Sequence, residues 1–156
     1  MNAPKLDQEL AHKFFSASCF NHAWDFIDKA SRTDDDNFEM IHLAHASIWH
    51  WMQRADCTEK NLSIGYWQLS RIYALVGDAN SARAYGQRCL QISPNDDPFL
   101  VGYAHEALAR AELVANNADQ LQQHKDEAKA LAEKVTDEES RKMLLSDLES
   151  LATKSN

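Results

Sequence analysis

The chain has 156 residues, a length that suits one domain or one short repeat array rather than two large domains. Its 24 acidic and 16 basic residues leave a net charge of -8, which argues against binding duplex nucleic acid, because that function needs clustered positive charge. The sequence has only 4 glycines and 3 prolines, so neither an all-β fold nor one with long loops is expected.

The three cysteines, Cys19, Cys57 and Cys89, stand far apart and form no Cys-x-x-Cys pair. A disulfide framework or a zinc finger is therefore not expected. The first ten residues lack the apolar core of a secretion signal, and no apolar run approaches about 18 residues, the length that indicates a membrane span. We expect a cytoplasmic protein with no membrane partner.

Apolar periodicity and helix-stop signals predict an all-α protein. The first segment is typical, because its apolar residues recur at steps of three and four: Leu6, Leu10, Phe14, Ala17, Phe20, Trp24 and Ile27. Asp35, Asp36 or Asn37 is expected to cap the second helix, and Thr136 the last. The predicted helices cover residues 5–30, 38–54, 61–76, 79 or 81 to 92, 99–115, 118–134 and 137–151.

The third segment, residues 61–76, carries apolar side chains on two sides of its helical wheel. One side holds Leu62, Tyr66, Leu69, Tyr73 and Val76, and much of the other holds Ile64, Trp67, Ala74 and Leu75. A helix that is apolar on both sides lies between two neighbours. This segment is therefore predicted to lie in the middle of a stack.

One stretch has the spacing of a helical repeat: Tyr66-x-x-Leu69-Ser70-x-x-Tyr73, then Gly77-Asp78, Ala82, Cys89-Leu90 and Pro94. It resembles a tetratricopeptide repeat. Small residues at 70 and 82 would let two helices approach, Gly77 would permit the turn, and Pro94 would end the second helix. The stretch departs from the repeat at Gly86, where the family has an aromatic residue.

The rest of the chain resembles this repeat more loosely. Residues 99–134 match it through Leu108, Ala109 and Ala128, and residues 5–54 only as a degenerate helical hairpin. Three further stretches resemble a group of bacterial repeat proteins of unassigned function: His42-x-x-His45-x-Ser47-x-x-His50-Trp51, Trp67-x-x-Ser70-Arg71-x-Tyr73 and Tyr103-x-x-Glu106-Ala107-x-Ala109-Arg110.

The resemblance implies one domain, residues 1–156, built from stacked antiparallel hairpins in a right-handed superhelix. The hairpins are expected at residues 5–54, 61–94 and 99–134. A last helix over residues 137–151 is expected to cap the exposed apolar end, because each repeat buries its face only against a neighbour.

Two charged constellations are candidates for a binding site. Trp67 and Arg71 lie one helical turn apart, and so do Glu106 and Arg110, with Phe99 and Tyr103 on the same side. These residues either fix the angle between hairpins or line a groove with aromatic walls and two guanidinium groups. Such a groove could grip a carboxylate.

The second helix is rich in histidine. His42 and His45 have a spacing that allows both to bind one metal ion, but no third ligand is evident from the sequence. His45 lies near the middle of the apolar stripe of that helix, so a buried histidine that is hydrogen-bonded to a neighbour is the structural alternative.

The function implied by the resemblance is a non-enzymatic module that binds a protein segment or a peptide. No phosphate-binding glycine loop, zinc-protease pair or nucleophile elbow is present, and no cofactor is expected. The alternative is a small-ligand or metal-binding protein that uses His42, His45 and a nearby aromatic wall. The sequence does not indicate an oligomeric state.

The acidic composition makes one direct prediction. The chain should not bind random duplex DNA at physiological salt, because its net charge is -8 and no basic cluster is present. A gel-shift assay at micromolar protein checks this, and a shift that weakens with added salt would contradict it.

Overall fold

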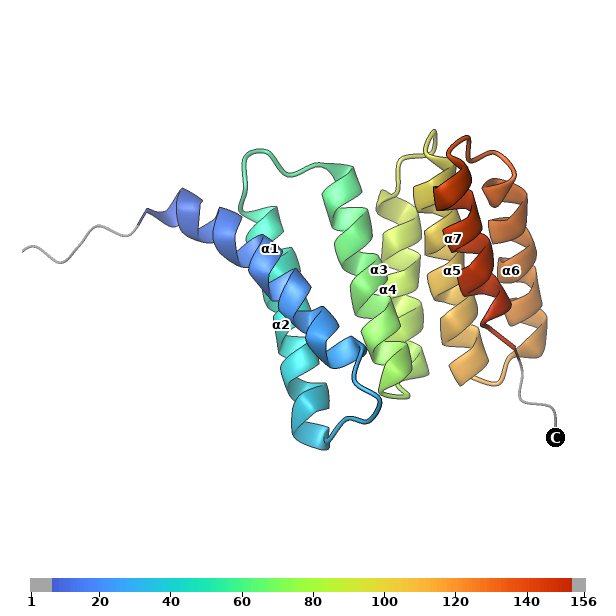
Figure 1. Cartoon of the computed structure of the whole chain (residues 1–156), viewed down its shortest axis with the longest axis horizontal. Helices are drawn as coiled ribbons and strands as arrows, with labels where there is room; N and C mark the ends of the chain where they lie inside the picture. Colours follow the sequence, from blue (N-terminus) through green and yellow to red (C-terminus); the bar gives the residue numbers. More distant parts are fainter. Residues whose placement is uncertain (1–6, 153–156) are drawn as a thin grey trace, which may run out of the picture.

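The computed structural model describes residues 7–152, and within this range the chain is all-α, as predicted (Figure 1). Its helices follow one another without a strand between them in the described residues. They are α1 (Gln8–Ile27), α2 (Asp34–Met52), α3 (Glu59–Leu75), α4 (Ala79–Ile92), α5 (Pro98–Val114), α6 (Ala118–Ala132) and α7 (Glu138–Glu149).

Each helix begins at a polar side chain that accepts a hydrogen bond from the first turn. Thr33 caps α2 and forms a capping box with Asp36, so the cap lies two residues before the predicted Asp35. Asp137 caps α7, and the predicted Thr136 does not. Both corrections have the same reason, because the polar runs at these two helix starts offer several adjacent oxygens of similar capping ability.

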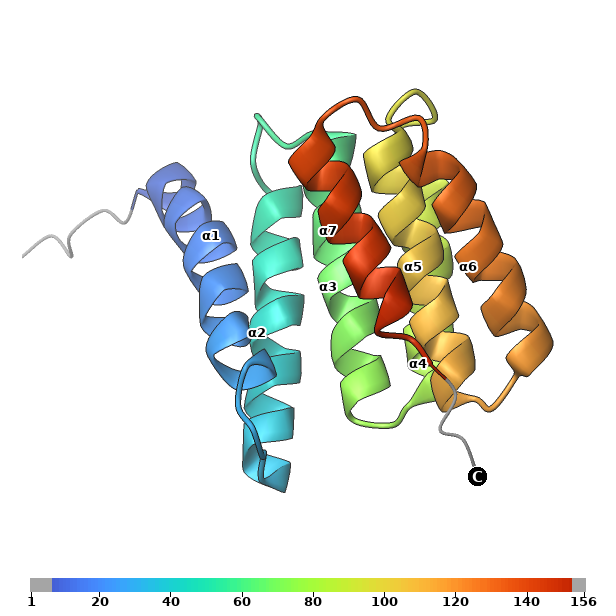
Figure 2. The same ribbon diagram turned by 45° about the vertical axis from the view of Figure 1, so that its right-hand side comes forward.

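The helices pair as antiparallel hairpins, α1 with α2, α3 with α4 and α5 with α6, and the hairpins stack side by side (Figure 2). Helix α3 packs against α2, α4 and α5, as its two apolar sides predicted. Helix α7 packs on α5 and α6. The expected placement of three hairpins and a covering last helix therefore agrees with the packing of the described residues.

Small residues set the spacing within and between hairpins. Gly77 turns α3 into α4 with a φ of 85°, a backbone conformation that favours glycine. The Ser70 hydroxyl donates to the Ala82 carbonyl at 2.7 Å and ties the two helices together. A Cβ at position 86 would lie 2.9 Å from a methyl carbon of Leu108. Gly86 therefore stands where the repeat has an aromatic residue because α5 approaches α4 closely there.

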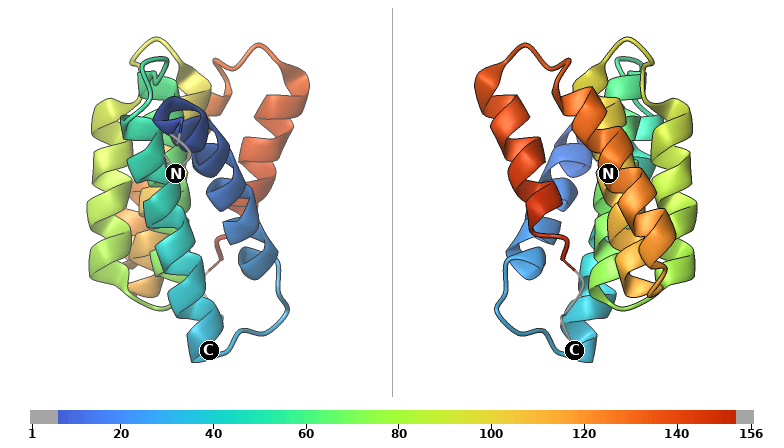
Figure 3. Two further views of the ribbon diagram at one scale, coloured as in Figure 1. Left: turned by 90° about the vertical axis from the view of Figure 1, so that its left-hand side faces the viewer. Right: turned by 90° about the vertical axis from the view of Figure 1, so that its right-hand side faces the viewer.

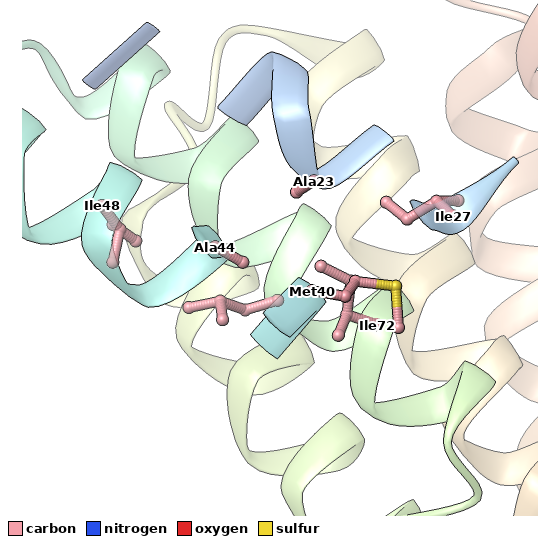
Figure 4. Close-up of a cluster of buried hydrophobic side chains, with 7 residues drawn as sticks. Ala23, Ile27, Met40, Ala44, Ile48 and Ile72 are labelled. Atoms are coloured by element: carbon pink, nitrogen blue, oxygen red, sulfur yellow. The ribbon is translucent and has the colours of Figure 1, made fainter. Parts of the chain in front are cut away.

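The core has two main parts. The first joins α1, α2 and α3 (Figure 4) and contains Ala23, Ile27, Met40, Ala44, Ile48, Leu69 and Ile72. The second joins α5, α6 and α7 and contains Tyr103, Ala128, Ala132, Leu144 and Leu148. Leu144 and Leu148 are fully buried, so α7 covers the apolar face that the last hairpin would otherwise expose.

The first residues of the apolar stripe along α1 are not part of the core. Leu10 is 64% exposed and Phe14 is 63% exposed, whereas Ala23 and Ile27 of the same helix are buried. Leu6 lies outside the described residues. The N-terminal half of α1 diverges from α3 (Figure 1), so the first two turns of the stripe have no helix opposite them.

None of the helices within residues 7–152 is both long and apolar enough to cross a membrane.

The packing of α3 predicts a large loss of stability in the Leu69→Ala variant. Leu69 is fully buried between hairpins, and truncating a buried leucine costs about 2–5 kcal/mol because it leaves a cavity. Urea unfolding measures this loss. Leu10→Ala is the matched control and should change the unfolding free energy by less than about 0.5 kcal/mol. A loss below about 1 kcal/mol for Leu69→Ala would show that this register is wrong.

Candidate functional site

A cleft of about 480 Å³ lies over α3, between α1 on one side and α7 on the other. Figure 3 shows that α1 and α7 project on the same side of the stack. Five helices supply the lining: Trp24, Ser63, Ile64, Trp67, Arg71, Cys89, Phe99, Leu100, Tyr103, Met143 and Asp147. The cleft therefore contains three of the five predicted binding residues, Trp67, Arg71 and Tyr103.

Aromatic rings form a continuous wall of this cleft. The ring centroids of Trp24 and Trp67 are 5.8 Å apart, and Tyr103 meets Trp67 edge-on at 5.5 Å. Phe99 meets Tyr103 in the same way at 5.0 Å. Edge-to-face contacts at these separations are favourable, so the rings hold one another in place. The wall crosses from α1 through α3 to α5.

Glu106 fixes the central ring of the wall from behind. Its side chain is fully buried and accepts a hydrogen bond from Trp67 Nε1 at 2.9 Å. Arg110, one turn further along α5, donates to the same carboxylate through Nε at 3.1 Å and forms an ion pair with it. A buried carboxylate requires such partners. These contacts use both residues structurally, and neither lines the cleft.

Arg71 is the positively charged residue that lines the cleft, and it lacks the ion pair that Arg110 forms with Glu106. Its guanidinium carbon lies 5.5 Å from the Trp24 ring and 5.7 Å from the Trp67 ring. Its Nε is buried without a hydrogen-bond partner among the described residues. Burial and the nearby Arg110 lower the pKa of Arg71, while Glu106 and Asp147 act in the opposite direction. The groove thus presents one guanidinium, where the sequence predicted two.

Helix α7 forms the wall of the cleft opposite α1, and one hydrogen bond ties it to α5. The Tyr103 hydroxyl donates to Asp147 at 2.7 Å and so ties α5 to α7. Burial and the neighbouring carboxylate raise the pKa of Tyr103, which keeps the hydroxyl protonated as the donor. Asp147 adds a negative charge to the cleft, near the positive charge of Arg71.

A smaller hollow of about 160 Å³ adjoins this cleft. It is lined by Ala17, Phe20, Asn21, Trp51, Asn61, Ile64 and Gly65. Ile64 lines both hollows. Gln68 of α3, which lines neither hollow, donates to the Phe20 carbonyl of α1 at 3.0 Å.

Several residues of the cleft carried no signal in the sequence. Trp24 was expected only as a member of an apolar stripe, and Asp147 and Met143 lie on the covering helix far along the chain. Phe99, by contrast, was expected on the same side of α5 as Tyr103, and both line the cleft.

The predicted histidine pair does not line either hollow. Nε2 of His45 and the Tyr73 hydroxyl share a hydrogen bond of 2.9 Å, and His42 is exposed. No three histidine, cysteine or acidic side chains within residues 7–152 lie close enough to hold a metal ion. Two other histidine pairs are in contact through their Nδ1 atoms, His12 with His50 at 2.8 Å and His105 with His124 at 3.1 Å.

Comparison of the chain with protein-family models, curated proteins and solved structures found no match. The resemblance to tetratricopeptide repeats therefore rests on the residues themselves.

The histidines predict a loss of stability in mild acid. Burial lowers the pKa of His45, His50, His105 and His124 in the folded chain, whereas the unfolded chain binds these protons near pH 6.5. Their contribution to stability is therefore complete above about pH 6.5 and is lost as the pH falls below it. Urea unfolding at pH 7.5, 6.5 and 5.5 measures the loss.

The double variant His105→Gln/His124→Gln tests which groups cause this dependence. It should lose less unfolding free energy between pH 7.5 and 5.5 than the natural chain, because two of the titrating groups are gone. An equal loss in the two proteins would rule out a contribution from this pair.

Proposed function

We propose that the chain is a non-enzymatic module that binds a protein segment or peptide in the cleft over α3. The observation that carries this proposal is Arg71, a partly buried cation with an unused hydrogen-bond donor in an aromatic cleft. Buried donors in proteins are almost always paired. A ligand acceptor at the Arg71 guanidinium would offset part of the cost of burying a cation that lacks this hydrogen bond.

The ligand group that suits Arg71 best is a carboxylate. A guanidinium offers its donors in a planar fork that matches the two oxygens of a carboxylate. The guanidinium lies beside both the Trp24 and the Trp67 ring, 5.5 Å and 5.7 Å from their centroids, and these contacts limit the side-chain freedom that binding would remove. Apolar side chains of the partner would pack on the rest of the aromatic wall.

The other polar groups of the cleft favour binding over chemistry. Burial raises the pKa of the Cys89 thiol to about 11, so this sulfur is protonated near neutral pH and is a poor nucleophile. The hydroxyls of Ser63 and Ser93 share a hydrogen bond of 2.7 Å, and no histidine lines the cleft. A nucleophile with an adjacent base is the arrangement that covalent catalysis requires.

A small apolar carboxylate is the second candidate ligand. The cleft volume of about 480 Å³ falls within the range of about 300–1,000 Å³ that is typical of small-molecule sites. This candidate uses the aromatic wall and Arg71. It does not use His42 or His45, which lie outside the cleft lining.

The Arg71→Ala variant tests the proposed function. It should melt within a few degrees of the natural chain, because Arg71 makes no ion pair among the described residues, and it should lose its partner in affinity capture from host lysate. Arg88→Ala is the control, since Arg88 is exposed and stacks on Tyr66 outside the cleft. Capture of the same partners by Arg71→Ala, or its unfolding, would leave the arginine without a binding role.

A further inference from the structure

The two hollows are parts of one groove. Ile64 lines both of them, and α1 and α3 contribute lining residues to each. Ala17 of α1 lines the smaller hollow, and Trp24 lines the larger one. Positions 17 and 24 are seven residues apart and so share one face of the helix. The face that α1 turns toward α3 is therefore a wall of the groove along two turns.

The same face continues beyond the smaller hollow as exposed apolar surface. Leu10 and Phe14 stand at helical spacing from Ala17, and their exposed fractions are 64% and 63%. Together with Ala17 and Trp24 they make an apolar track along most of α1. Contiguous exposed apolar surface of this kind marks an interaction site. Its continuity with the hollows indicates one long partner rather than two small ligands.

A helical partner repeats the spacing of Ala17 and Trp24 on α1, one of which lines each hollow. Seven residues of α-helix span about 10.5 Å at a rise of 1.5 Å per residue. The same seven-residue step on a second helix laid along α1 would bring two side chains over the two hollows. Such i and i+7 anchors are typical of helix-in-groove recognition.

The groove also suits a helix better than an extended segment. Its walls are helices whose own backbone groups are already paired, so they offer no strand edge to an extended chain. Only two side-chain amides line it, those of Asn21 and Asn61, and both lie at the smaller hollow. An extended segment would leave backbone N–H and C=O groups unpaired against an apolar wall, whereas a helix satisfies them internally.

Charge fixes the direction of the partner. Arg71 lines the larger hollow together with Asp147, and no lysine or arginine within residues 7–152 lines the smaller one. An acidic side chain within one turn of the second anchor would therefore lie near the Arg71 guanidinium.

We propose that this groove binds an amphipathic α-helix of a partner protein, with apolar side chains at i and i+7 in the two hollows and a glutamate or aspartate near the second. This inference rests on the proposed function and names the class of segment that the cleft recognises. The exposed track of Leu10 and Phe14 extends the same contact by about two further turns of the partner.

The test begins with a phage library of fully random 18-residue peptides, selected on the full chain. The strongest peptide is then synthesised with a fluorescein label and measured by fluorescence anisotropy. The expected peptides carry apolar residues seven apart with an acid beside the second. A proline placed between the two anchors should weaken binding at least tenfold, and circular dichroism should show helix formed on binding.

Three variants of the chain locate the peptide. Ala17→Asp places a charge at an exposed position of the smaller hollow, and Arg71→Gln removes the charge of the larger one. Each should weaken binding at least tenfold without changing the melting temperature by more than a few degrees. Phe38→Ser is the matched control, because Phe38 is 60% exposed but lines neither hollow, and it should bind as the natural chain does.

The outcomes separate the two proposals. If Arg71→Gln weakens binding but Ala17→Asp or the proline does not, the helical partner is wrong and the proposed function stands. If no peptide is enriched, or if neither groove variant weakens binding, both proposals fail.

Discussion

The buried carboxylate of Glu106 is the interaction on which the rest of the cleft depends. It joins α5 to α3 through the Trp67 indole and is itself neutralised by Arg110 on its own helix. A charge at zero exposure is tolerated only with partners of this kind. Because the indole is fixed, the rings packed on either side of it are fixed as well, and the wall becomes rigid before any ligand arrives.

Arg71 and Arg110 therefore have different roles. Arg110 is paired with Glu106, whereas Arg71 forms no ion pair with that carboxylate and its Nε has no hydrogen-bond partner among the described residues. The positive charge in the cleft is therefore not cancelled by direct contact, although Glu106 and Asp147 both act on it at longer range. A site with a fixed aromatic wall and an arginine that forms no ion pair selects its ligands by both charge and shape.

The helices, their order and the buried middle position of α3 could be predicted from the sequence, because periodicity and caps are local signals. The pairing of Glu106 with Arg110 was equally local. Which of the two arginines, Arg71 or Arg110, faces the cleft could not be predicted, since that depends on how α5 is rotated against α3. For the same reason periodicity identified Leu10 and Phe14 as part of one apolar face but not that both side chains are exposed. The contributions of Trp24 and Asp147 required the stacking of helices far apart in the chain.

The close approach at Gly86 has a consequence for the evolution of the groove. The residue lines neither hollow, yet it determines how near α5 lies to α4. Helix α7 packs on α5. A change in the distance between α4 and α5 would therefore also move α7, which forms one wall of the cleft. A larger side chain at position 86 would change the width of the groove without altering any residue inside it. Ligand size in this architecture can therefore drift through substitutions at hairpin joints, while the binding surface keeps its chemistry.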